Sequence, residues 1–310
     1  MKFKYNFKVY APATIADFAV NNSNYSIALQ HLQDEVILKK SSNPGVVIQR
    51  IINNKTKIPQ DILTNTAGYA AQLVQKHLVR TRKLDTSLGI ELELRKKIPL
   101  ANGLGSSIAS ACAAALATNV AFGQQLDRKE LIPFIQEAIQ EITHKNRISS
   151  IVACLEGGLI LNSEEQGLDY YRFPLPRGLQ FCIAVPKIKA QQFNSRFETN
   201  NDSPKKINSN NAATLTQALY TNNLALIKKS LKNYFAYPNC KTLTDLKNKT
   251  YQKEVLYFDF INKGPDMFAF CKNTADAENT SNVFSAFYES QKIKHYIYIS
   301  SINQEGCTAT

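Results

Sequence analysis

Apolar and polar residues alternate along the chain with two different periods, and these periods predict strands and helices in mixed order. Short apolar or alternating runs predict strands at 1–10, 25–29, 34–39, 45–51, 90–100, 155–161, 180–186, 254–260, 267–271 and 295–299. Apolar residues recurring every three or four positions predict helices at 67–79, from about 106 and at 128–142. The stretch 212–234 is amphipathic, and we expect a turn at 218–224 within it. The polar run 200–211 predicts a loop. This order favours a mixed α/β fold without a solenoid repeat.

One stretch, IPLANGLGSSIASACAAALATN at 98–119, joins a tight turn to the start of a helix. Gly103 and Gly105 allow the turn, and we predict Ser106 or Ser107 as the N-cap of the helix that follows. A helix N-terminus beside a glycine loop has free N–H groups, which bind anions and most often phosphate. The alternative is an ordinary strand–turn–helix connection without a ligand.

Length and composition describe an ordinary globular chain. With 310 residues, 44% of them hydrophobic and 20% charged, it has room for one large or two medium domains. The segment YYRFPLP suggests a boundary, which predicts an N-terminal domain at 1–175 and a C-terminal domain at 176–310. The first residues alternate Lys and aromatic side chains and lack the apolar core of a signal peptide, and no run is long enough for a membrane span. We therefore expect a cytoplasmic protein without a membrane partner.

The cysteines and the net charge each bear on the class of partner. Six scattered cysteines without a C-x-x-C pair argue against a zinc site and a disulfide framework, so we predict free thiols. The net charge of +12 raises nucleic-acid binding as an alternative function. However, Lys and Arg are spread along the chain without a stacking-aromatic motif. We predict a solvated basic surface and no nucleic-acid partner, with Lys96 and Lys97 adding a positive field near the glycine loop.

The glycine stretch resembles the phosphate loop of the galactokinase, homoserine kinase, mevalonate kinase and phosphomevalonate kinase superfamily. The resemblance rests on an alternating basic strand, followed by P-x-x-x-G-L-G-S-S and then by an alanine-rich helix. The stretch is not a Walker A loop, because no Gly-Lys-Ser/Thr follows the glycines. Pro12-Ala13-Thr14 and the Leu-Glu-Gly-Gly-Leu run at 155–159 narrow the resemblance to homoserine kinases, over about residues 8 to 307.

That resemblance implies a two-lobed α+β small-molecule kinase fold. Its N-terminal α/β domain is of a type shared with a ribosomal protein, and its C-terminal domain is ferredoxin-like. It also implies ATP and Mg²⁺ as cofactors, transfer of phosphate to the homoserine hydroxyl in threonine biosynthesis, and a nucleotide and a small amino-acid-like substrate as partners. It leaves a homodimer open.

Site residues carry over from the family by position. For Asn65 the implied role is contact with the nucleotide base, and the alternative is a helix N-cap. Ser106 is implied to bind the metal as well as phosphate, Arg196 to bind the substrate carboxylate, and Asp17 stands near enough in sequence to replace a lost acid. The implied nucleotide-binding residues are Asn65, Pro99, Gly103, Leu104, Gly105, Ser106 and Ser107.

Several family positions hold other residues here, mostly where homoserine would bind. The departures are Ser23 and Ser149 for acids, Gln192 for Thr, Cys240 for Arg, Ile139 between Glu137 and Glu141 for the magnesium Glu, and Ile261-Asn262-Lys263-Gly264-Pro265 for S-G-S-G-P. Three hypotheses stay open: a divergent homoserine kinase, a related kinase with another acceptor, and a non-enzymatic paralogue that keeps the fold. We expect ATP binding, with homoserine phosphorylation slow or absent.

Overall fold

The computed structural model describes most of the chain. The described residues are 6–16, 25–53, 57–82, 88–100, 103–162, 169–199, 209–231, 237, 239–261 and 264–310. They form two compact units. Unit 1 comprises Met1–Thr14, Ser26–Tyr171 and Asn303–Thr310, and unit 2 comprises Ile15–Tyr25 and Arg172–Ile302.

The end of the chain belongs to unit 1. Strand β11 (Thr308–Ala309) pairs antiparallel with β1 (Phe7–Ala16). Thr310 and Lys8 exchange two backbone hydrogen bonds of 2.9 and 3.2 Å. The guanidinium of Arg128 donates to the C=O groups of Glu305, at 2.8 Å, and Cys307, at 2.7 Å. These long-range contacts have no signature in local hydropathy.

Unit 1 is built on a sheet with the strand order β11-β1-β2-β4-β3, to which β5 is added beside β2 and β6 beside β5. Its further strands are β2 (Tyr25–Ser41), β3 (Gly45–Ile52), β4 (Gly89–Arg95), β5 (Leu159–Asn162) and β6 (Tyr170–Phe173). Strands β3 and β4 are parallel neighbours because helix α1 (Thr66–Arg82) connects them as a crossover. A short 3-10 helix (Ile62–Thr64) precedes α1.

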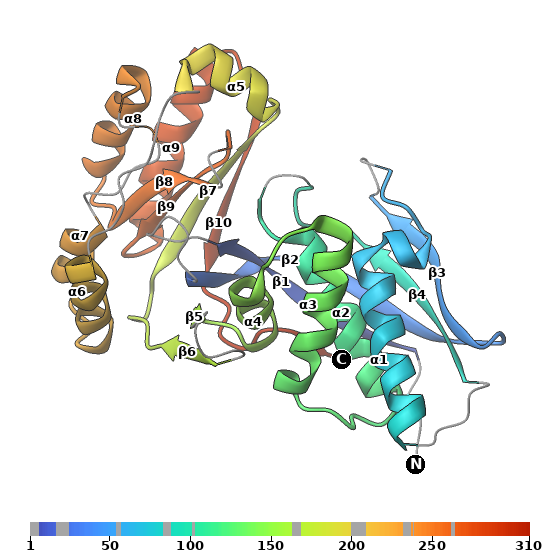
Figure 1. Ribbon diagram of the computed structural model, residues 1–310. Helices are drawn as coiled ribbons and strands as arrows, with labels where there is room; N and C mark the ends of the chain where they lie inside the picture. Colours follow the sequence, from blue (N-terminus) through green and yellow to red (C-terminus); the bar gives the residue numbers. More distant parts are fainter. Residues whose placement is uncertain are drawn as a thin grey trace. The chain divides into compact units, whose positions relative to one another are not determined.

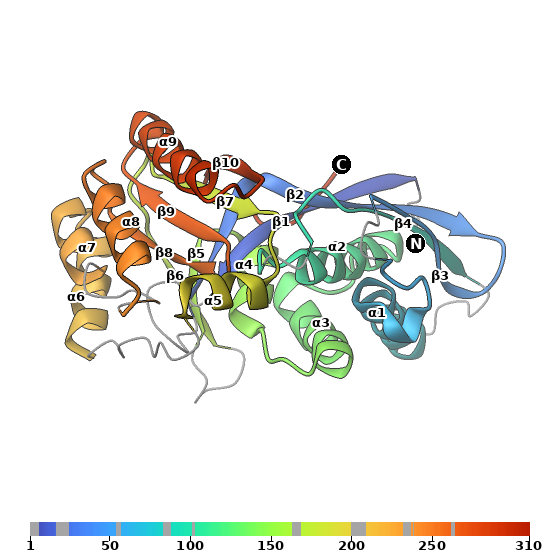
Figure 2. The same cartoon turned by 90° about the horizontal axis from the view of Figure 1, so that it is seen from above.

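Three helices lie side by side against one face of this sheet: α1, α2 (Ser106–Ala121) and α3 (Arg128–Thr143) (Figures 1 and 2). Helix α2 is buried on nearly all sides, and its alanines let the neighbouring helices approach closely. Helix α4 (Ile148–Glu156) leads into β5. The phosphate-loop candidate therefore precedes the most deeply buried helix of unit 1.

Unit 2 has an antiparallel sheet in the order β10-β7-β9-β8. Its strands are β7 (Gln180–Pro186), β8 (Tyr257–Phe260), β9 (Met267–Cys271) and β10 (His295–Ser301). Its helices are α5 (Ala190–Phe197), α6 (Ser209–Tyr220), α7 (Leu224–Leu231), α8 (Lys241–Tyr251) and α9 (Thr274–Ser290). Helices follow the first and third strands, and an aromatic-rich core joins α5, α8 and α9 to the sheet. This is the ferredoxin-like topology that the resemblance implied.

Several element boundaries differ from the predictions. The strands expected at 25–29 and 34–39 form one strand, β2. The turn expected at 218–224 within the amphipathic stretch lies between α6 and α7, with Asn222 at a positive φ of 53°. The expected loop at 200–211 is helical from Ser209, and 200–208 lie outside the described residues. Leu155 and Glu156 end α4 instead of starting a strand. These bounds depend on long-range packing, which the local period of apolar residues does not record.

The cysteine prediction is confirmed. All six cysteines are free thiols, and each is buried except Cys240, which is half-buried. Within the described residues, no helix is both long and apolar enough to cross a membrane.

Candidate functional site

The glycine loop lies between β4 and α2, as the sequence predicts. Gly103 and Gly105 have positive φ angles of 71° and 76°, which side chains with a Cβ rarely adopt. The N-cap of α2 is Gly105 and not a serine, so that prediction is wrong. The helix already begins at Ser106, whose hydroxyl turns inward to a buried acid described below.

The loop rests on the end of β1, at the Pro-Ala-Thr motif. The backbone N–H of Thr14 donates to the C=O of Leu104 at 3.1 Å, and both residues are buried. A Cβ added to Gly105 would lie 2.5 Å from the Thr14 hydroxyl oxygen. Gly105 is therefore required twice, for its backbone angle and for the close approach of Thr14. Thr14 and Gly105, 91 positions apart in the sequence, thus belong to one structural unit.

The first turn of α2 presents backbone N–H groups at the loop. The first bond within the helix runs from the N–H of Ala109 to the C=O of Gly105 at 2.8 Å. The N–H groups of Ser106, Ser107 and Ile108 precede it and have no acceptor within the helix. Gly105 has no side chain to cap them. This arrangement has the chemistry of an anion site, and Ser107 is exposed beside it.

A buried carboxylate, Asp34, holds the loop and the helix from below. Its Oδ1 accepts the backbone N–H groups of Lys97 and Ile98, both at 2.9 Å. Its Oδ2 accepts Lys96 Nζ at 2.5 Å, Ser106 Oγ at 2.8 Å and Ser110 Oγ at 3.1 Å. Asp34 is fully buried, so these five donors replace its whole hydration.

Lys96 is the counter-charge of this network. Its ammonium contacts Asp34, the C=O of Ser106 at 2.8 Å and the hydroxyl of Ser110 at 2.5 Å, and the residue is 5% exposed. Burial lowers the pKa of Lys96, and the carboxylate of Asp34 opposes that shift. We name Asp34, Lys96, Ser106 and Ser110 the Asp34 network.

The Asp34 network corrects the prediction that Lys96 and Lys97 add a positive field for phosphates. Lys96 is buried against Asp34, and Lys97 pairs with Glu35. Arg95, the third member of the basic cluster, pairs with Glu93 at 2.7 Å. The cluster therefore neutralises acids of the sheet, and the backbone of α2 remains as the source of positive potential.

A signal for this network was present in the sequence. Leu92, Leu94, Lys96 and Ile98 occupy alternate positions, and the three apolar ones are buried. A lysine in the buried phase of such a pattern requires an acid partner. Local period shows the need for that acid, but it does not identify Asp34, which lies 62 positions earlier.

Asn65 caps helix α1. Its Oδ1 accepts the N–H groups of Ala67 at 3.0 Å and Gly68 at 3.2 Å, and its Nδ2 donates to the C=O of Pro59 at 2.7 Å. The residue is 3% exposed. The geometry is that of the N-cap alternative, and the implied contact with a nucleotide base stays a prediction. Pro99 and Leu100 lie half-buried just after β4.

Metal-binding side chains are sparse near the loop. Ile139, at the family's glutamate position, is buried in the core, and Glu137 and Glu141 are exposed. Within the described residues, no group of three or more His, Cys, Asp or Glu side chains could hold a metal ion. Ser106 gives its hydroxyl proton to Asp34, which leaves lone pairs of Oγ for a cation.

Ser149 and Ser150, which stand at family positions for substrate contacts, lie in a cluster of three serines with Ser26 in unit 1. Ser26 Oγ lies 3.0 Å from Ser149 Oγ and 3.1 Å from Ser150 Oγ. Ser26 and Ser150 are buried and Ser149 is half-buried. Three neutral hydroxyls satisfy one another here, where the family resemblance implies charged contacts.

The remaining predicted residues lie in unit 2 or outside the described residues. Arg196 is exposed in the last turn of α5, and Gln192 is exposed on the same helix. Cys240 precedes α8. Asp17 and Ser23 lie outside the described residues, as do Asn262 and Lys263. The structure therefore brings together the loop residues from Gly103 to Ser107 with Thr14, and the predicted substrate contacts of unit 2 stay predictions.

Comparison with known proteins gives a consistent family. Residues 65–158 match the GHMP kinases N-terminal domain family. Homoserine kinase of Chlorobium phaeobacteroides strain BS1 is 25% identical over 314 residues, covering 96% of this chain and 97% of that protein. The crystal structure of homoserine kinase from Cytophaga hutchinsonii superimposes with a TM-score of 0.85 at 27% identity. The match covers 100% of this chain and 99% of that one. L. major mevalonate kinase shares the fold, with a TM-score of 0.67 at 14% identity over 97% of this chain and 99% of that one. Residues 65–158 are thus similar to the N-terminal domain of GHMP kinases, and the chain resembles homoserine kinases over its full length.

Proposed function

We propose that this protein is an ATP-dependent kinase that phosphorylates the side-chain hydroxyl of homoserine. The observation that carries the proposal is the full-length likeness to homoserine kinases in both sequence and fold. The glycine loop supports it, since its backbone geometry is suited to phosphate. The alternatives of another acceptor and of a non-enzymatic paralogue are not favoured by these comparisons.

The loop would bind the phosphates of ATP through backbone groups. The N–H groups at the start of α2 would hold phosphate oxygens, and the exposed hydroxyl of Ser107 would add a donor. Gly103 and Gly105 let the backbone approach the ligand closely. Phosphoryl transfer relies mainly on such positioning and on electrostatic stabilisation, and backbone amides supply part of both.

Mg²⁺ would accompany ATP, but the fit of the described side chains to the ion is partial. Ser106 Oγ is a suitable oxygen ligand, whereas Ile139 replaces the carboxylate that the family resemblance implies. Magnesium commonly keeps several waters and uses substrate phosphates as ligands, which is compatible with one protein oxygen. When bound, the ion would neutralise charge on the β- and γ-phosphates.

The acceptor side of the reaction carries the departures from the family. Arg196 is the residue that we assign to the homoserine carboxylate, and Asp17 is the one that we assign to its ammonium group. A charge-assisted hydrogen bond contributes about 1.5–3 kcal/mol. Because Ser23 and Ser149 replace acids, we expect slower turnover than an enzyme with those contacts would have.

A coupled assay of ADP release tests the proposal. We expect ATP- and Mg²⁺-dependent ADP release that requires homoserine, with phosphohomoserine identified by mass spectrometry. Glycerol and L-serine serve as acceptor controls, since each has a hydroxyl but lacks the full homoserine skeleton. Equal or faster turnover with one of them would indicate another acceptor. ATP binding by calorimetry without any turnover would instead support the non-enzymatic paralogue.

A further inference from the structure

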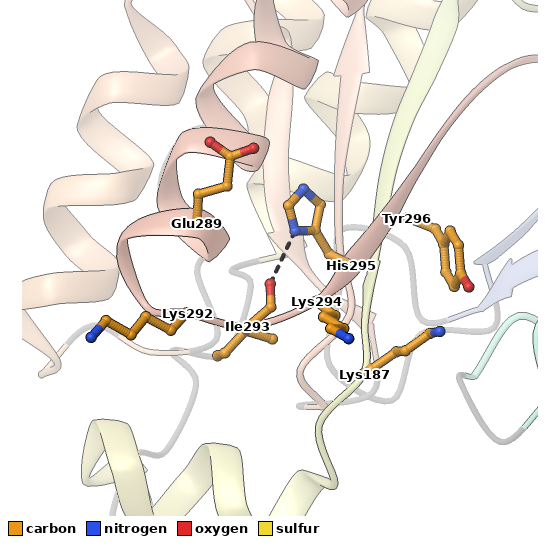
Figure 3. A pocket seen from close by; sticks show the side chains of 7 residues that line it. All are labelled: Lys187, Glu289, Lys292, Ile293, Lys294, His295 and Tyr296. Atoms are coloured by element: carbon orange, nitrogen blue, oxygen red, sulfur yellow. Dashed lines mark hydrogen bonds between the residues drawn. The ribbon is translucent and has the colours of Figure 1, made fainter.

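Unit 2 carries a hollow at one end of its sheet, distinct from the loop of unit 1. It has a volume of about 480 Å³, within the usual range for small-molecule sites. The lining residues come from the end of β7, the end of α9 and the start of β10: Lys187, Glu289, Lys292, Ile293, Lys294, His295 and Tyr296 (Figure 3). Three lysines and one glutamate give the lining a surplus of positive charge.

The lysines of this hollow differ from the basic cluster of unit 1 in their partners. Lys187, Lys292 and Lys294 are all exposed, and none forms an ion pair with an acid among the residues that the structure describes. This contrasts with Arg95, Lys96 and Lys97 of unit 1, which all pair with acids. An unpaired cluster of cations in a concavity is suited to an anion from solution.

Lys187 and Lys294 lie opposite each other, each one residue beyond the paired ends of β7 and β10. Pro186 of β7 pairs with His295 of β10, so the next pair along the ladder is Lys187 with Lys294. The N–H of Lys187 donates to the C=O of Lys294 at 2.6 Å. Like charges directly opposite on a sheet are destabilising. Two lysines at this position therefore act against stability unless a bound anion compensates them.

Two contacts fix the shape of the lining. Lys187 Nζ lies 4.7 Å from the centroid of the Tyr296 ring, and His295 Nδ1 lies 3.1 Å from the C=O of Ile293 (Figure 3). The turn before them is held by the N–H of Ile293, which donates to the C=O of Tyr288 at 2.9 Å. The cationic lining is thus partly preorganised.

Lys292 has a separate structural reason to be basic. It follows the C-cap of α9, where a cation interacts favourably with the helix dipole, and it extends to the opposite side from Lys187 (Figure 3). Lys187 and Lys294 lie outside any helix, so the dipole does not account for them. The argument for a ligand therefore rests on this pair.

We propose that this hollow binds a small oxyanion with at least two negative charges, held between Lys187 and Lys294. The ammonium groups supply point charges with several N–H donors, which suit phosphoryl and carboxylate oxygens alike. A phosphorylated metabolite and a polycarboxylate share this chemistry. The site is separate in sequence from the ATP loop and does not depend on the proposed kinase activity.

Calorimetry with inorganic pyrophosphate and with citrate tests the site in the full chain. Each titration is repeated with a non-hydrolysable ATP analogue at saturation, which removes the contribution of the glycine loop. We expect binding to persist with the analogue and to weaken at least about tenfold in the K187Q/K294Q variant, since two charge-assisted contacts are lost. A K241Q variant is the matched control, because Lys241 is an exposed lysine of the same unit outside the hollow.

The outcomes separate the proposal from general charge effects. Tighter binding of pyrophosphate would identify a phosphoryl ligand, and tighter binding of citrate a carboxylate one; both support the proposal. Equal weakening in K241Q and K187Q/K294Q would overturn it, as would failure of both anions to bind. Complete displacement of both anions by the ATP analogue, to the same extent in wild type and in K187Q/K294Q, would also overturn it.

Discussion

Two polar clusters of unit 1 differ in the groups that they bury. The Asp34 network keeps a buried carboxylate and a buried ammonium, and five donors satisfy the carboxylate. The serine cluster of Ser26, Ser149 and Ser150 holds only neutral hydroxyls. The phosphate-loop end thus retains charge inside the protein, whereas the end assigned to the acceptor has lost it.

The two clusters differ in how strongly they fix the positions of the groups around them. A buried ion pair contributes little net stability, but it fixes which groups lie together because breaking it is costly. Asp34 joins β2, the end of β4 and the start of α2, and so it sets the shape of the loop. Hydroxyls impose a weaker constraint and bind charged groups weakly. We infer that the nucleotide half of the site is more tightly defined than the acceptor half.

The largest effect is expected from D34N, which breaks the Asp34 network. The variant leaves Lys96 buried without its counter-charge, and losing one partner of a buried pair destabilises a protein by about 3–5 kcal/mol. Urea unfolding measures the loss. The double variant D34N/K96M is the control, since removing both charges should restore part of the stability. Unchanged stability in D34N would show that the pair does not fix the loop.

The loss in D34N should also depend on pH. Burial lowers the pKa of Lys96 in the folded protein, so the unfolded chain binds more protons between that pKa and the ordinary lysine value of about 10.4. Stability attributable to Lys96 therefore rises with pH within this window. Without Asp34, which opposes the shift, the window extends to lower pH. The difference in unfolding free energy between wild type and D34N should therefore be smaller at about pH 10 than at about pH 7.

G105A tests the loop itself and should have the next largest effect. Its Cβ would need a positive φ of 76° and would lie 2.5 Å from the Thr14 hydroxyl, so we expect a loss of about 1–3 kcal/mol in stability. ATP affinity measured by calorimetry should fall as well. G105A/T14A removes the hydroxyl contact but keeps the φ strain, so it should recover part of the loss. Wild-type ATP affinity in G105A would contradict a role of this backbone in phosphate binding.

S149D restores an acid on the acceptor side and tests the weaker cluster. The hydroxyl of Ser26 lies within hydrogen-bonding distance of this position and can donate to the new carboxylate. If the acceptor is homoserine, the KM for homoserine should fall about tenfold, since one charge-assisted contact contributes about 1.5–3 kcal/mol. The KM for ATP should not change. S149N keeps the size without the charge, and the same gain there would exclude an electrostatic cause.

K97Q should have the smallest effect. The Lys97 side chain is 54% exposed, and the buried Glu35 keeps a second cation, Arg95 at 3.8 Å, when Lys97 is replaced. We expect a change in stability below about 1 kcal/mol and less than about threefold in the KM for ATP. A larger, salt-dependent rise in that KM would mean that surface charge at the loop does guide the nucleotide.

The sequence predicted the loop and its elements because their determinants are local. Glycines at 103 and 105 and the apolar face that begins at Ile108 are sufficient to place a turn before a helix. The N-cap was missed because Ser106 bonds to Asp34, an acceptor 72 positions away. Asp34 was predicted only as the first residue of a strand, because no local pattern shows which lysine it pairs with.

The acceptor side was less predictable for a related reason. The resemblance indicated which family contacts are missing, such as the acid at position 149, but hydroxyl partners follow from the packing of α4 on β2. Helices α5, α8 and α9 likewise escaped prediction, because their apolar faces are matched to an aromatic core assembled from distant segments. Local period carries no information about such partners.

The closing contacts of residues 303–310 have a consequence for the order in which the protein can mature on the ribosome. A Cβ on Gly306 would lie 2.0 Å from the C=O of Leu155, so the returning segment is inserted tightly beside α4. Unit 1 cannot complete its sheet until unit 2 has been synthesised, since β11 comes last in the chain. Stalled chains released before and after this segment emerges should differ sharply in protease resistance of unit 1. The unit that we propose to bind nucleotide would then become functional only after unit 2 and residues 303–310 have emerged.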